Sequence, residues 1–120
     1  MRENLIETKS KAFALRVVKL YEYLRGKKEC VMSKQILRSG TSIGANVAEG
    51  QFAQTRADFL TKYSIALKEA SETRYWLELL DTAGYLPKVE SSKTLLSDCT
   101  ELIRLLAASV KTTRQRKTPP

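Results

Sequence analysis

The sequence has no histidine, and only two cysteines and three prolines occur among its 120 residues. Without histidine, Cys30 and Cys99 cannot build a usual zinc site, and we expect them to be reduced thiols rather than part of a disulfide framework. We therefore expect no metal and no other cofactor. The scarcity of proline leaves room for long uninterrupted helices.

Long apolar runs are also missing. No run approaches the roughly 18 residues that a membrane-spanning helix needs. The opening residues, MRENLIETKSK, lack the apolar core of a secretory signal, so we expect a cytoplasmic protein with no membrane contact. The length suits one domain with a single modest core.

Positive charge is abundant and unevenly distributed within a net charge of +8. Residues 1–28 carry eight basic and three acidic side chains, and residues 87–120 carry seven and three. The segment between them is close to neutral, with two and two over residues 29–50 and four and five over residues 51–86. This asymmetry favours a polyanionic partner. The alternative is a basic surface that only keeps the protein soluble.

Apolar and small residues recur every three or four positions in four segments, which predicts four helices. The four series are Ile6, Phe13, Val17, Leu20 and Leu24; Ile36, Gly40, Ile43, Val47 and Gly50; Phe59, Tyr63, Ala66, Ala70, Thr73, Leu77 and Leu80; and Leu96, Cys99, Ile103, Leu106 and Val110. Short links between them predict an all-α fold, an antiparallel up-and-down four-helix bundle over residues 1–112. Residues 113–120 are basic and poor in apolar side chains, and we expect a disordered tail there.

Residues with capping and turn chemistry mark the expected helix ends. Thr55 followed by Asp58 predicts the start of the third helix, and Gly84 predicts its end. Ser91 or Ser92 can cap the start of the fourth helix.

The stretch Gly40-Thr41-Ser42-Ile43-Gly44 matches two patterns with different meanings. As G-x-S-x-G it is the nucleophile elbow of serine hydrolases, which needs a strand before the serine and a general base. The apolar series runs through Ser42 in helical steps and histidine is absent, so we expect no catalytic residue and no enzyme. As G-x-x-x-G it predicts close packing by another helix, since each helical glycine costs about 1 kcal/mol relative to alanine.

Next to these glycines runs a polar strip made of Gln35, Ser39, Ser42, Asn46 and Glu49. It is either a solvated face or a partly buried one whose groups need hydrogen-bond partners. Candidate partners are Arg38 on the same helix and Ser71, Glu72, Thr73 and Arg74 on the third helix.

The runs Arg38-Ser39, Ser42-Ile43 and Asn46 through Gly50 resemble the signature of small proteins called 23S rRNA intervening-sequence proteins, also labelled S23 ribosomal proteins. The similarity extends from about residue 5 to residue 108 and includes Phe59, Ala66, Glu69, Glu72, Tyr75-Trp76-Leu77 and Gly84-Tyr85. It implies an antiparallel four-helix bundle. It also implies structural roles for the signature residues Arg38, Ser39, Ser42, Ile43, Asn46, Glu49 and Gly50.

The family is in turn similar to the accessory protein of diversity-generating retroelements, whose pentameric rings engage nucleic acid and a reverse transcriptase through a basic surface. The resemblance therefore implies a homo-oligomer, a pentamer, with RNA, DNA, a reverse transcriptase or another protein as partner. Two hypotheses follow: a non-enzymatic oligomer that binds nucleic acid without sequence preference, or an oligomeric protein-interaction scaffold. For the first, the candidate contacts, which an oligomer could gather into one basic band, are Lys9, Lys11, Arg16, Lys19, Lys27, Lys28, Lys111, Arg114, Arg116 and Lys117.

Overall fold

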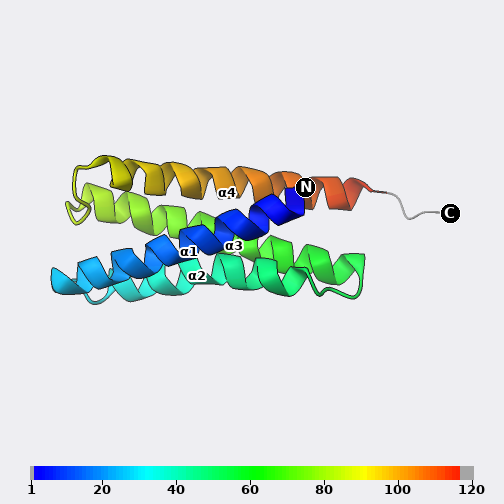
Figure 1. The fold of residues 1–120 in the computed structure, drawn as a ribbon, viewed down its shortest axis with the longest axis horizontal. Helices are drawn as coiled ribbons and strands as arrows, with labels where there is room; N and C mark the ends of the chain where they lie inside the picture. The colour runs from blue at the N-terminus through cyan, green and yellow to red at the C-terminus, as the bar shows by residue number, and fades with distance from the viewer. Residues whose placement is uncertain (1, 117–120) are drawn as a thin grey trace.

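The computed structural model describes the backbone of residues 2–116 and the side chains of residues 5–116. Its described part consists of four helices and contains no strand: α1 (Arg2–Gly26), α2 (Met32–Gly50), α3 (Arg56–Thr82) and α4 (Glu90–Gln115). Successive helices run in opposite directions along a bundle of 57 × 21 × 19 Å (Figure 1). This confirms the predicted all-α four-helix bundle.

Each helix packs against two others. α1 contacts α2 and α4, and α3 also contacts α2 and α4. Within the described residues no Cα atom of α1 lies within 8 Å of one of α3, so the two helices occupy diagonally opposite corners of the bundle. This arrangement gives α1 and α3 outward faces on opposite sides of the molecule.

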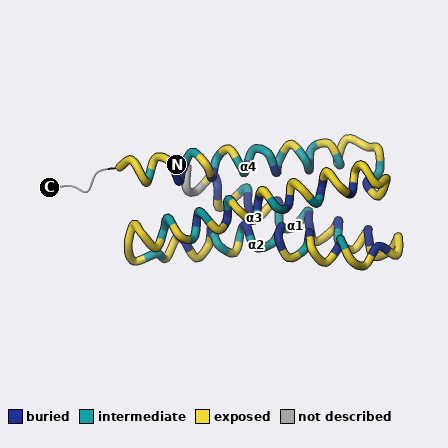
Figure 2. Tube along the Cα trace, turned by 180° about the vertical axis from the view of Figure 1, so that it is seen from behind, coloured by how far each residue is buried: buried dark blue, intermediate teal, exposed yellow. Residues whose placement is uncertain are grey.

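The core is built from one stripe of each helix, and buried positions line the inner faces along the bundle (Figure 2). The series predicted for the first three helices is confirmed, except that Phe59 is only half-buried. In α4 the prediction is wrong at two positions, because Leu95 and Leu102 are buried whereas Leu96 and Ile103 are half-buried. Both positions fall in pairs of adjacent aliphatic residues, so the spacing did not distinguish between them.

The helix ends follow the sequence in some places and not in others. The amide of Asp58 donates to Thr55 Oγ1 at 3.0 Å, and Gly84 adopts φ +84°, as predicted for the two ends of α3. The serine cap predicted for α4 is wrong: the helix begins at Glu90, after Val89, and no side chain caps it. Ser91 and Ser92 already lie in its first turn.

The end of α4 also differs from the expectation. The helix continues to Gln115, beyond the expected bundle boundary at residue 112. Near this end Val110 is buried and the hydroxyl of Thr113 donates to the carbonyl oxygen of Ser109 at 2.8 Å. Residues 117–120 of the expected tail lie outside the described residues.

Candidate nucleic-acid interface

Gly40 and Gly44 of α2 lie where α1 approaches this helix closely. A Cβ atom on Gly40 would lie 2.8 Å from both γ-carbons of Val17, and one on Gly44 would lie 3.3 Å from the carbonyl oxygen of Ser10. Ser42 sits between them inside the helix and donates to the carbonyl oxygen of Arg38 at 2.7 Å. The packing interpretation is therefore confirmed, and the strand that a nucleophile elbow requires is not present before this serine.

The polar strip of α2 is partly buried against α3. The hydroxyl of Thr73 donates to Ser39 Oγ at 2.8 Å inside the bundle. Arg38 pairs with Glu69 at 3.2 Å and also with Glu72, which accepts a further hydrogen bond from Trp76 Nε1 at 3.0 Å. Of the partners proposed for the strip, Thr73 bonds to Ser39, and the backbone carbonyl oxygen of Arg38 accepts from Ser42. Glu72 instead bonds to Arg38 and Trp76, which are not strip residues.

The remaining candidates bond elsewhere. Ser71 donates to the carbonyl oxygen of Leu67, and Arg74 pairs with Glu78 one turn along α3. Asn46 donates to the carbonyl oxygen of Ser42 at 2.9 Å. Lys62 pairs with Glu49 at 2.7 Å and so provides another link between α2 and α3.

The pKa of the Glu72 carboxyl is lowered from its ordinary value. The hydrogen bond from Arg38 is the largest cause, and the hydrogen bond from Trp76 comes next. The hydrogen bond to Glu72 likewise raises the pKa of Arg38. Both groups are therefore held in their charged forms. The other signature positions serve packing: Ile43 is fully buried, and a Cβ atom on Gly50 would lie 2.8 Å from the ring of Tyr63.

Two of the ten basic candidates are used to join α1 to α4. Lys9 pairs with Glu101 at 3.1 Å and Arg16 pairs with Asp98 at 2.7 Å. The Arg16 guanidinium also donates to the carbonyl oxygen of Ser91 at 2.7 Å and to Thr94 Oγ1 at 3.0 Å. Their charge is already paired within the molecule, which makes both residues poor candidates for phosphate contacts.

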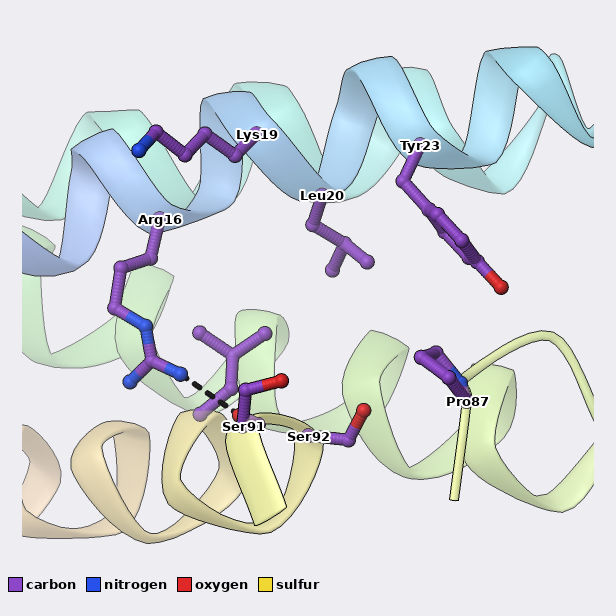
Figure 3. Close-up of a pocket in the computed structure, with 8 residues that line it drawn as sticks. Arg16, Lys19, Leu20, Tyr23, Pro87, Ser91 and Ser92 are labelled. Carbon is purple, nitrogen blue, oxygen red and sulfur yellow. Dashed lines mark hydrogen bonds between the residues drawn. The ribbon is translucent and has the colours of Figure 1, made fainter. Parts of the chain in front are cut away.

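An open hollow of about 280 Å³ lies beside these ion pairs, between α1 and the start of α4 (Figure 3). Leu20 and Leu95 give it an apolar lining, Tyr23 and Pro87 flank one side, and Arg16 reaches across the other to Ser91. The seam between α1 and α4 is thus held by ion pairs on one side of an incompletely filled space.

The other described basic candidates are exposed, and none of them forms an ion pair with a described residue. Lys11 and Lys19 lie on the outer face of α1. Lys27 and Lys28 lie in the turn after it, where Lys28 adopts φ 66°. Lys111, Arg114 and Arg116 lie at the end of α4, whereas Lys117 falls outside the described residues.

The two exposed clusters lie at opposite ends of the bundle. The turn after α1 is at one end of the long axis and the end of α4 is at the other (Figure 1). A single protomer therefore does not gather them into one band. Sequence reasoning missed Arg56, whose guanidinium donates to the carbonyl oxygen of Arg116 and which adds positive charge at the end of α4. The sequence did offer one signal for Arg56: it directly follows the Thr55 cap and therefore lies at the start of α3.

The described residues contain no cluster of metal-ligating side chains, and none of their helices is long and apolar enough to cross a membrane. The thiol of Cys99 is fully buried, and burial raises its pKa to about 12, so the nucleophilic thiolate is scarce at neutral pH.

Comparison with known proteins agrees with this architecture. A model of the family described as 23S rRNA-intervening sequence protein matches residues 2–108. A crystal structure of a protein of unknown function from the S23 ribosomal protein family of Bacteroides thetaiotaomicron is 53% identical, with a TM-score of 0.87. The match covers 92% of this chain and 99% of that one. No curated protein matches the chain. Because the family model matches residues 2–108 and the solved relative is 53% identical over 92% of the chain, the chain belongs to the 23S rRNA-intervening sequence protein family.

Proposed function

We propose that this protein is a non-enzymatic homo-oligomer that binds RNA or DNA without sequence preference through the exposed basic clusters at the ends of its bundle. The observation that carries the proposal is the cluster at the end of α4. Lys111, Arg114 and Arg116 are exposed there, and no described carboxylate pairs with them. Exposed cations without a carboxylate partner attract phosphates, and their binding releases the counterions condensed on the nucleic acid.

Phosphate contacts position nucleic acid without reading its bases. Tyr63 is buried and packs against Phe59 with ring centroids 4.1 Å apart, so it cannot stack on a base. Assembly would strengthen weak binding, because each added copy presents the same cluster to one strand. The pentamer and the reverse-transcriptase partner that the resemblance implies belong to this proposal.

The test is a fluorescence-anisotropy titration of labelled single-stranded RNA and duplex DNA at about 50 mM salt, where phosphate contacts are strong. The variant K111Q/R114Q/R116Q removes the α4 cluster. The control K34Q/K68Q/K93Q removes the same charge from exposed lysines elsewhere. We expect the first variant to bind much more weakly than the wild type and the control to lose less. Equal losses would show that only net charge matters, and no binding by the wild type would reject the function.

A protein-interaction scaffold is the second candidate, and one observation favours it. Phe52, in the link between α2 and α3, is 85% exposed, and aromatic residues are enriched at protein interfaces. If the wild type assembles but binds no nucleic acid, the scaffold becomes the preferred function.

A further inference from the structure

The outer face of α1 exposes aliphatic side chains between cations. Leu15 is 61% exposed and Val18 is exposed beside it. Lys11 and Lys19 stand four positions before and after Leu15, so both lie on its side of the helix. Neither lysine forms an ion pair with a described residue. This surface, Lys11, Leu15, Val18 and Lys19, is called the α1 stripe below.

The outer face of α3 has the complementary character. Tyr75 is 58% exposed and Leu79 lies one turn further along. Glu72 and Glu78 stand three positions before and after Tyr75. Arg38 and Arg74 already pair with these glutamates, and both pairs remain partly exposed. This surface, Glu72, Tyr75, Glu78 and Leu79, is called the α3 stripe below.

The charges of the two helices also differ as a whole. The described side chains of α1 include five basic and two acidic residues, whereas α3 carries four basic and five acidic residues. Leu15, which lies between lysines, can therefore pack against Tyr75, which lies between glutamates. Complementary charge at the rim of an apolar contact selects the partner and sets its register.

The two stripes cannot meet within one molecule, because α1 and α3 occupy opposite corners of the bundle. We infer that the α1 stripe of one copy packs against the α3 stripe of a second copy. This contact joins two different surfaces, so every copy keeps one free stripe, and repetition gives a closed ring or an open filament. The inference rests on the homo-oligomer of the proposed function and names the surfaces that build it.

The contact also divides the basic residues between two tasks. Lys11 and Lys19 are used between copies, which leaves Lys27 and Lys28 at one end and the α4 cluster at the other for nucleic acid. Because the contact runs along the sides of the bundle, it leaves both ends accessible.

The experiment uses light scattering after gel filtration on the wild type, on Leu15→Glu and on Tyr75→Glu. Each variant places an unpaired carboxylate in an apolar contact, which is costly when it is buried. The control is Val31→Glu, an even more exposed apolar position in the turn before α2, outside both stripes. Circular dichroism checks that every variant remains helical. We expect an oligomeric wild type and control, and a monomer for each stripe variant.

Mixing the two stripe variants gives the most specific test. Leu15→Glu keeps an intact α3 stripe and Tyr75→Glu keeps an intact α1 stripe, so we expect the equimolar mixture to form a 1:1 dimer and nothing larger. Folded variants that stay monomeric when mixed, or variants that keep the wild-type mass, would overturn the contact while leaving the oligomer of the proposed function intact. A monomeric wild type would instead overturn that oligomer itself, and this inference with it.

Discussion

At the scale of single residues, Gly40 shows how one missing methyl group fixes the packing of two helices. Alanine is the better helix former by about 1 kcal/mol. Its Cβ would nevertheless lie 2.8 Å from both γ-carbons of the fully buried Val17. We expect Gly40→Ala to lower the free energy of unfolding by about 1–2 kcal/mol, because overpacking outweighs helix propensity.

The matched control is Gly26→Ala, since a Cβ atom at Gly26 would meet nothing within 4 Å. Urea denaturation of both variants supplies the comparison. A Gly40→Ala protein as stable as Gly26→Ala would show that the close approach of α1 and α2 is not tight.

The two cysteines should differ sharply in reactivity. Cys30 is exposed, whereas Cys99 is buried, hydrogen-bonded to the carbonyl oxygen of Ala70, and has its pKa raised to about 12. A colorimetric thiol reagent at pH 8 should titrate one thiol in the folded protein and two in denaturant. Mass spectrometry should locate the first label on Cys30. Rapid modification of Cys99 in the native state would contradict its burial.

Glu72 predicts a pH dependence of stability. Its folded-state pKa is lowered by hydrogen bonds from Arg38 and Trp76, so its contribution is present above the pKa of about 4.3 expected in the unfolded chain. That contribution is lost as the pH falls through the lower folded-state pKa. Thermal denaturation of wild type and Glu72→Gln should show a stability gap at pH 7 that closes in acid. If the stability difference between wild type and Glu72→Gln stays constant down to pH 2, the lowered pKa of Glu72 is not its cause.

At the scale of elements, the start of α2 depends on a carboxylate three residues upstream. Glu29 is buried and accepts from the amides of Val31, Met32 and Ser33, the last at 2.6 Å. It satisfies backbone donors that no helical carbonyl can reach and places negative charge at the positive end of the helix. We expect Glu29→Ala to cost about 1–2 kcal/mol, the upper range for loss of a cap.

Glu22→Ala is the control for this change, because Glu22 is an exposed glutamate of α1 with no described partner. Its replacement should alter stability by less than about 0.5 kcal/mol. Thermal denaturation of both variants at pH 7 provides the measurement. Equal effects would mean that the Glu29 hydrogen bonds contribute nothing beyond its charge.

The elements themselves could be predicted because apolar spacing reports directly on a helix with one buried face. The register of α4 could not, since Leu95-Leu96 and Leu102-Ile103 offer two apolar stripes and only packing against α1 and α3 selects one. The Glu29 cap was missed because it acts from the turn rather than from the usual cap position. The ion pairs of Lys9 and Arg16 depend on how α1 is rotated against α4, which local sequence does not specify.

At the scale of the whole molecule, the distribution of charge in the sequence becomes a spatial arrangement. Segments 1–28 and 87–120 both carry excess positive charge. Folding uses part of it for the α1–α4 ion pairs and leaves other cations exposed on the outer face of α1, at the two ends of the bundle and, at Arg104, along α4. Sequence reasoning proposed the basic candidates but not this division, because the division depends on which helices become neighbours.

The most direct test of the proposed function is the slope of log affinity against log salt for labelled duplex DNA, compared between wild type and K111Q/R114Q/R116Q. Each phosphate contact contributes about −0.9 to this slope. We predict a steep linear dependence for the wild type. The variant slope should be shallower by up to about 3 for each protomer that contacts the duplex, with the oligomer intact. Tight binding by the wild type that hardly changes with salt, or an identical slope in the variant, would contradict binding through the end of α4.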